Sequence, residues 1–189
     1  MRIIFAVVLF FSVWLIPSVI FAQNSNAQQR TQEIVSLLSK TKYLFRAQRG
    51  VSKEKYKSVR SEPVIYKNTV DYSGSYEVPS VGYSLEIKIS ANGEIAAVGS
   101  QPKDGDVQQE RKFTFRNAKI DGALLTATKV YDDGSTEKFE GVFINQINIE
   151  GTSPTKIERQ STTFGLGVVD VRVKTASGVN LDKLFYHKK

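Results

Sequence analysis

Cysteine is absent from this chain of 189 residues, and histidine, methionine and tryptophan each occur once. Without cysteine the chain can form no disulfide, no thiolate metal site and no thiol nucleophile. The single histidine, His187, is followed by two lysines, and we expect it to lie in a solvated tail. A serine–histidine–acid triad needs a positioned histidine, and the GxSxG motif is also absent. We therefore predict no catalytic residue, no metal and no cofactor.

The remaining motifs for chemistry are incomplete. Gly165-Leu166-Gly167 lacks the third glycine and the following helix of a dinucleotide site, so we interpret it as a strand bend or a close packing position. Asp104-Gly105-Asp106 and the stretch from Asp132 to Glu137 carry the oxygens that calcium prefers. Neither has the spacing of a calcium loop, and aspartate with glycine is equally typical of turns. A carboxylate pair for glycoside hydrolysis stays possible but cannot be assigned.

The first 22 residues have the composition of a secretion signal. Arg2 gives a positive start, Ile3 to Ile16 is almost unbroken apolar sequence, and cleavage is predicted near Ala22. The alternative is an uncleaved anchor helix, because the apolar run is about long enough to span a bilayer. Pro17 argues against that alternative by breaking the helix. We therefore expect a secreted or periplasmic protein with no membrane span after cleavage.

Positive charge is concentrated directly after this signal. Residues 23–62 hold nine basic and three acidic residues, a net charge of +6, whereas residues 63–189 hold sixteen of each. The change in composition falls at Glu62-Pro63, and a residue before proline is disfavoured in helices. The sequence therefore predicts a signal peptide (1–22), a basic helical N-terminal segment (23–62) and a β domain (63–189).

The basic segment carries an apolar stripe at helical spacing. The stripe consists of Ile34, Leu37, Leu38, Thr41 and Phe45. Gly50 is expected to end this amphipathic helix, and Ser52 could cap a second short helix. Residues 23–29 are polar and are predicted to be disordered.

The same segment supplies the candidate binding residues. Lys40, Lys42, Arg46 and Arg49 lie beside or opposite the apolar stripe and could dock the protein on an anionic envelope component. The alternative is that the stripe packs on the β domain and the cations are merely solvated. Nucleic acid is not expected as a partner, because the chain is expected to be exported and its β part offers no interleaved aromatic platform.

Beyond residue 63 the period of hydrophobicity changes to two. In the stretch 83–90, Tyr83, Leu85 and Ile87 alternate with polar residues, and Asn92-Gly93 then predicts a hairpin turn. Further strands are predicted at 64–66, 75–78, 95–98, 113–116, 124–131, 136–144, 162–174 and 181–186, with a loop at 101–109 and an irregular stretch through Pro154. The short links favour a mainly β fold, a single antiparallel barrel or sandwich of about eight to ten strands with an N-terminal amphipathic helical segment.

Gly74-Ser75-Tyr76 lies at the start of the first predicted barrel strand, and a meander of hairpins follows it. With tyrosine in place of tryptophan, it resembles the glycine-x-aromatic signature of lipocalin-like (calycin-type) exported bacterial β-barrel proteins. Leu124 to Gly134 and Phe139 to Ile144 resemble the hairpins of uncharacterised exported proteins. The resemblance implies a β-barrel, and about eight strands enclose room for side chains or one small ligand.

Three functions follow as hypotheses. We expect a non-enzymatic exported β-barrel that binds a small apolar ligand at residues that the sequence does not specify. The first alternative is an envelope-associated interaction module that docks through its basic N-terminal helix. The second is a carboxylate-based hydrolase.

Overall fold

The computed structural model describes residues 15–48, 51–78, 82–103, 106–175 and 178–189. The fold is mainly β, with one α-helix before the strands, as the sequence predicted. In chain order the elements are α1 (Leu15–Leu38), β1 (Lys40–Gln48), β2 (Val51–Pro63), the 3-10 helix η1 (Thr69–Tyr72), β3 (Gly74–Val78), β4 (Tyr83–Ile89), β5 (Ile95–Lys103), β6 (Asp106–Asp121), β7 (Leu124–Tyr131), β8 (Thr136–Ser153), β9 (Lys156–Thr175) and β10 (Gly178–Lys188).

Eight of the strands close into a ring. The order β8-β7-β6-β5-β4-β3-β10-β9 returns to β8, and every neighbouring pair is antiparallel. The shortest ladder of the ring joins β3 to β10. It consists of two pairs, Glu77 with His187 and Tyr76 with Lys188. Because the ring closes, its strands leave no open edge. An open edge is the main risk of an antiparallel sheet, since it can pair with strands of other chains.

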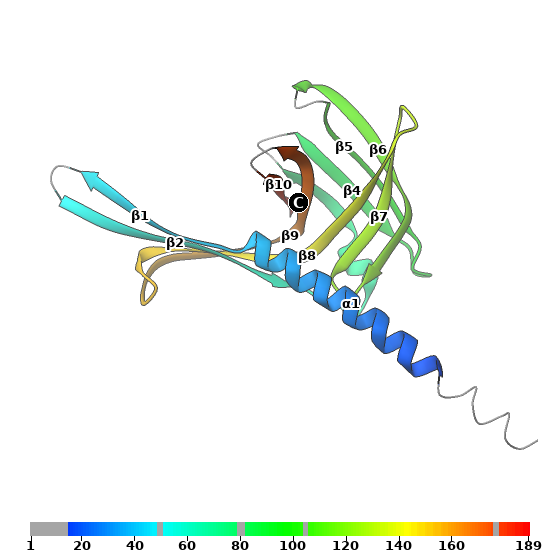
Figure 1. The fold of residues 1–189 in the computed structure, drawn as a ribbon, viewed down its shortest axis with the longest axis horizontal. Helices are drawn as coiled ribbons and strands as arrows, with labels where there is room; N and C mark the ends of the chain where they lie inside the picture. The colour runs from blue at the N-terminus through cyan, green and yellow to red at the C-terminus, as the bar shows by residue number, and fades with distance from the viewer. Residues whose placement is uncertain (1–14, 49–50, 79–81, 104–105, 176–177) are drawn as a thin grey trace, which may run out of the picture.

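A second part of the sheet projects from the barrel (Figure 1). The end of β8 and the start of β9 run on together beyond the ring, and β2 and then β1 pair alongside β8. The resulting four-stranded sheet, in the order β1-β2-β8-β9, is called the extension below. Because β8 is 18 residues long and β9 is 20, both strands belong to the barrel and to the extension.

The helix α1 packs on the outside of the barrel beside the extension (Figure 1). Its side chains Ile34, Val35 and Leu38 are buried in a small apolar cluster of their own. The barrel side of this cluster consists of Ala123, Leu124, Val142, Ile144 and Phe185. Of the predicted stripe, Ile34 and Leu38 therefore face the β domain, whereas Thr41 and Phe45 lie in β1. Burial of the three aliphatic side chains stabilises the contact by several kcal/mol, at about 1.5–3 kcal/mol each.

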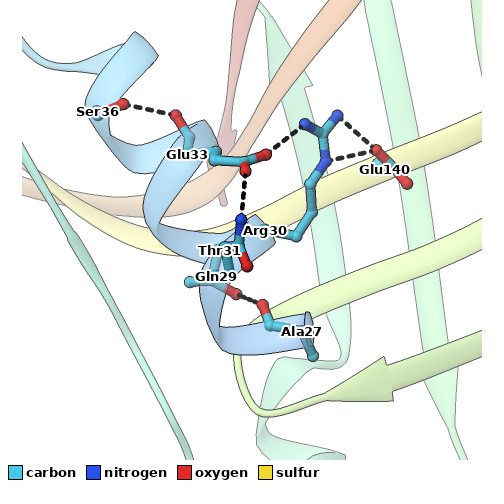
Figure 2. A network of polar contacts seen from close by, with 7 residues as sticks. All are labelled: Ala27, Gln29, Arg30, Thr31, Glu33, Ser36 and Glu140. Atoms are coloured by element: carbon cyan, nitrogen blue, oxygen red, sulfur yellow. Dashed lines mark hydrogen bonds and ion pairs between the residues drawn. The ribbon is translucent and has the colours of Figure 1, made fainter. Parts of the chain in front are cut away.

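Arg30 fixes the helix on the barrel through ion pairs (Figure 2). Its Nη2 lies 2.7 Å from Oε2 of Glu140 in β8, and its Nη1 lies 2.9 Å from Oε2 of Glu33 one turn along the helix. Hydrogen bonding to Arg30 lowers the pKa of Glu33, and the same two carboxylates raise the pKa of Arg30. The pair with Glu140 joins α1 to β8, and because both side chains are partly exposed it adds little stability.

One end of the barrel is plugged by η1. Tyr72 is fully buried, and its ring stacks on that of Phe143 with centroids 4.2 Å apart. Its hydroxyl accepts the backbone N–H of Tyr66 at 2.9 Å and lies 3.0 Å from the carbonyl oxygens of Val64 and Gly122. Burial raises the pKa of Tyr72, and it raises that of the neighbouring Tyr76 further. These contacts join the segment after β2 to the β6–β7 turn.

The predicted helices beyond residue 39 are wrong. Residues 40–48 and 51–63 form the antiparallel strands β1 and β2, so the basic segment 23–62 is helical only in its first part. Its second part belongs to the same sheet as the barrel, because β2 pairs with β8 as far as Pro63. The composition change at Glu62-Pro63 therefore marks the end of a strand and does not separate two folding units.

Other expectations about local structure also change. Residues 23–29, predicted to be disordered, lie within α1, and Pro17 lies in the first turn of that helix, where proline is tolerated. The predicted strand at 64–66 is absent, and the irregular stretch before Pro154 is instead the continuation of β8 to Ser153. Within the described residues, no helix has the combined length and apolarity that a membrane span requires.

Candidate cationic interface

Basic residues gather on one face of the extension. Residues that stand opposite each other in an antiparallel ladder share a face, and the register pairs Lys42 with Lys57, Lys57 with Glu150 and Glu150 with Arg159. Alternation along the strands then assigns seven basic positions to this face. They are Lys40, Lys42, Arg46, Lys53, Lys55, Lys57 and Arg159. This face of the extension is called the cationic face below.

Acidic residues are scarce among the described positions of the cationic face. Glu150 is the one acid that the ladders place there, and Glu158 lies unpaired in the β9 bulge between Ile157 and Arg159. Glu158 and Glu150 line a hollow of about 490 Å³ together with Lys55 and Lys57. Even with both acids counted, the basic residues exceed the acidic ones by five.

The electrostatics of Glu150 agree with this register. Nζ of Lys57 donates a hydrogen bond of 2.6 Å to Glu150 Oε1, and this contact lowers the pKa of Glu150 below its ordinary value. Arg159 and Lys55 lower the pKa further through their charges. Both side chains of the pair are almost half exposed, so the pair itself adds little stability. It does show that cations from β2 and β9 surround the same carboxylate.

The structure places the sequence-predicted docking residues in a different element. Lys40, Lys42 and Arg46 lie at alternate positions of strand β1, while Arg49 falls outside the described residues. They share a face because successive side chains of a strand point to opposite faces of the sheet, and helical spacing plays no part. Sequence reasoning missed Lys53, Lys55, Lys57 and Arg159 as members of the same face. The alternation of Lys53, Lys55 and Lys57 with other residues was the available signal, and it was interpreted as a short helix.

The barrel interior is filled largely by aromatic and aliphatic side chains. Phe143 lies 6.1 Å from Tyr76 and 6.4 Å from Phe164 between ring centroids, and Phe115 lies 4.7 Å from Phe139. The apolar ligand that the sequence suggested stays a prediction.

A buried lysine lies among these rings toward the end opposite η1. Lys129 is 5% exposed, its Nζ donates to Oε1 of Gln101 at 3.1 Å, and it lies 3.4 Å from Oε2 of Glu137. The same Nζ lies 5.1 Å from the ring centroid of Phe113 and 5.4 Å from that of Phe139. A buried ammonium group is costly unless it is paired, so these contacts compensate its charge.

A larger hollow, of about 600 Å³, lies over the outer face of β3–β7. Its lining includes Ser84 and Glu86, the exposed residues that alternate with the buried positions of β4. Two of its carboxylates are held by lysines, since Glu77 lies 2.5 Å from Lys189 and Glu86 lies 3.0 Å from Lys88. The lining also holds Glu110 and Asp132. A hydrolase would need two acids that face each other across a substrate, and Glu77 and Glu86 are each paired with a cation, so the hydrolase stays a prediction.

The remaining described candidates have structural roles, whereas Asp104 and Gly105 of the other acidic cluster lie outside the described residues. His187 lies in β10 opposite Glu77 with its ring 4.7 Å from that of Phe185, which corrects its expected place in a solvated tail. Asp133 accepts the backbone N–H of Ser135 at 2.8 Å in the β7–β8 turn, as a turn residue would. Among the described residues, no three histidine, cysteine or acidic side chains converge on a metal position.

The two glycines of Gly165-Leu166-Gly167 occupy the predicted close packing positions. A Cβ at Gly165 would lie 2.1 Å from the carbonyl oxygen of Tyr186, and one at Gly167 would lie 2.4 Å from Cδ1 of Leu38. The glycines therefore let β10 and α1 approach β9.

Comparison with protein families, with curated proteins and with solved structures finds no match to this chain.

Proposed function

We propose that this protein is exported and docks peripherally on an anionic phospholipid surface through the cationic face of its extension. The segregation of charge carries the proposal. Seven basic positions share the cationic face, whereas the opposite face of the paired strands holds Glu54, Arg60 and Glu62. If both faces of the sheet contacted only water, no interaction would favour one face for the basic residues.

The expected affinity follows from the charge. Each lysine or arginine close to an anionic membrane contributes about 1 kcal/mol, so an excess of five gives roughly 5 kcal/mol. This value corresponds to a submillimolar dissociation constant, which means reversible binding that is sensitive to salt. The barrel would then be held beside the membrane and released when the ionic strength rises.

The shape of the extension favours a planar surface over nucleic acid. Four strands at about 4.8 Å spacing make a face about 19 Å wide, which exceeds the roughly 12 Å of a DNA major groove. The aromatic positions Tyr43, Phe45 and Tyr56 lie on the other face of the extension, away from the cations. Stacking of bases on aromatic rings among the cations is therefore not available.

Vesicle binding tests the proposal. The full chain should cosediment with vesicles of phosphatidylglycerol in phosphatidylcholine, and not with phosphatidylcholine alone. Binding should weaken progressively between about 0.1 M and about 1 M salt. The triple variant K55Q/K57Q/R159Q should lose most of the binding.

The matched control is K88Q/K119Q/K138Q, which removes the same charge from exposed positions on the barrel. It should bind nearly as tightly as the unaltered chain. Equal losses in the two triple variants would mean that net charge alone drives binding, and the proposal would then be wrong. Tighter binding to a DNA or RNA duplex than to anionic vesicles at the same salt concentration would also contradict it.

A further inference from the structure

The second face of the extension carries a group of apolar residues beside the charged positions Glu54, Arg60 and Glu62. The register assigns Ile147 and Ile149 of β8 to this face, together with Tyr56 of β2 and Ile157 of β9. In β1 the alternate positions Tyr43, Phe45 and Ala47 fall on the same side. This side is called the apolar face below. A sheet buries such a face against another layer in stable folds.

Exposure on the apolar face increases away from the barrel. Ile147 is buried at 7% exposure, Tyr56 and Ile149 are partly buried, and Ile157 is 48% exposed. Ile157 is one of the three large hydrophobic side chains of the described chain that are notably exposed. The apolar surface therefore lies at the free part of the extension.

The helix α1 lies on the other side of the sheet. Leu38 reaches Gly167, which stands opposite Val142 in the ladder, and alternation along β8 puts Val142 and Ile144 on the same side as Glu150. The one helix of the described residues therefore lies on the side of the cationic face and leaves the apolar face without a second layer.

We infer that the apolar faces of two copies of this chain stack on each other, giving a two-layer sandwich with a cationic face on each outer side. The charges of the apolar face suit a second copy. Arg60, which lies 3.1 Å from Glu62 in the same strand, stands on the face that also holds Glu54. Under a two-fold axis, Arg60 of each copy can face a glutamate of the other, so the surface complements itself.

Pairing through the free edge of the extension is disfavoured. β1 is the outermost strand, and edge strands commonly recruit further strands. However, Lys40, Lys42 and Arg46 repeat along β1, and like charges opposite each other in a ladder are destabilising. Stacking of apolar faces avoids this repulsion, because it places the two cationic faces on opposite outer sides of the pair.

The size of the surface sets the strength of the association. The β2–β8 ladder has eight residue pairs. Eight residues at about 3.4 Å and four strands at about 4.8 Å give roughly 500 Å² a copy, or about 1,000 Å² for two. This area is at the lower limit of stable specific interfaces, so we expect a monomer–dimer equilibrium that depends on concentration. The inference does not depend on membrane docking.

Sedimentation equilibrium of the full chain, without vesicles, tests the inference. The chain should pass from monomer to dimer as its concentration rises. Ile157→Lys should raise the dissociation constant at least about tenfold, because it places a charge on the apolar face where an isoleucine is 48% exposed. The matched control is Ile65→Lys, at a side chain that is 71% exposed and lies outside the strands of the extension. It should leave the dissociation constant within about twofold.

The possible outcomes are distinct. A chain that stays monomeric at every concentration, or equal effects of the two lysine variants, would overturn the inference. If Ile157→Lys instead abolishes binding to neutral phosphatidylcholine vesicles, the apolar face enters lipid and a second copy does not cover it. The triple variant K55Q/K57Q/R159Q should still form the dimer, so failure of the docking proposal leaves this result unaffected. Circular dichroism spectra of both lysine variants should match that of the unaltered chain.

Discussion

Lys57 and Glu150 face each other across the β2–β8 ladder, with Nζ of the lysine 2.6 Å from Oε1 of the glutamate. The glutamate is the one acid that the described ladders place among seven basic positions. It therefore lowers the positive potential at the centre of the cationic face. Substitution of Glu150 therefore tests the proposed docking surface more directly than substitution of any one cation.

Removal of that carboxylate should strengthen docking. Glu150→Gln raises the net charge of the face by one, so binding to anionic vesicles should increase roughly fivefold at low salt. The pKa of Glu150 is lowered by Lys57, so its carboxylate supports the fold above the ordinary glutamate range and loses this effect as the pH falls. Isothermal titration with vesicles measures the change, and unchanged or weaker binding would contradict the docking proposal.

Asp133 should titrate near pH 2. Hydrogen bonds from the Ser135 side chain and backbone, with Arg111 at 2.8 Å, lower its pKa from 3.8 to about 2. A lowered folded-state pKa contributes stability that is complete above about pH 4 and is lost as the pH falls toward 2. Asp133→Asn should therefore flatten the decline of Tm between pH 4 and pH 2. NMR titration of the side-chain carboxyl measures the pKa, and Asp132→Asn at the same turn is the control.

Alanine at Gly165 should destabilise the protein more than alanine at Gly167. The new Cβ at Gly165 meets the backbone oxygen of Tyr186 at 2.1 Å, whereas at Gly167 it meets the flexible ends of Leu38 and Ile144. Overpacking costs about 1–3 kcal/mol where side chains can shift, and more where backbone must move. Chemical denaturation gives the order. Hydrogen exchange should show loosening of α1 for Gly167→Ala and of the β9–β10 ladder for Gly165→Ala.

The Tyr72 hydroxyl should stabilise the plugged end of the barrel. Tyr72→Phe keeps the ring on Phe143 but leaves the backbone N–H of Tyr66 without its acceptor. A buried polar group without a partner costs about 1–3 kcal/mol, so urea unfolding should reveal a loss of that size. Tyr72→Leu, which also removes the ring contact, should lose more. Equal stability of Tyr72→Phe and the unaltered chain would show that water replaces the hydroxyl.

The strands of the barrel could be predicted because local signals agreed with the tertiary structure. Tyr83, Leu85, Ile87 and Ile89 alternate with polar residues, and Asn92-Gly93 follows directly, so both period and turn chemistry indicate a hairpin. β7 was predicted with its observed bounds, Leu124–Tyr131, for the same reason. In each case the partner strand is the next one in the chain.

The hairpin β1–β2 could not be predicted in this way. Leu38, Thr41 and Phe45 continue the helical spacing of α1, while Tyr43, Phe45 and Ala47 also fit a strand, so period alone does not decide. The decisive pairing joins β2 to β8, some 90 residues later, for example Lys57 to Glu150. Long-range pairing of this kind overrides local propensity. The cationic face was missed because its membership depends on that register.

The length of β8 and β9 has a mechanical consequence. Both strands pass from the extension into the barrel without leaving the ladder that joins them, from Ser153 with Lys156 at the far turn to Gly141 with Val168 in the ring. A hydrogen-bonded strand pair transmits tilt and twist along its length. A surface that binds the extension therefore also sets the direction of the barrel axis.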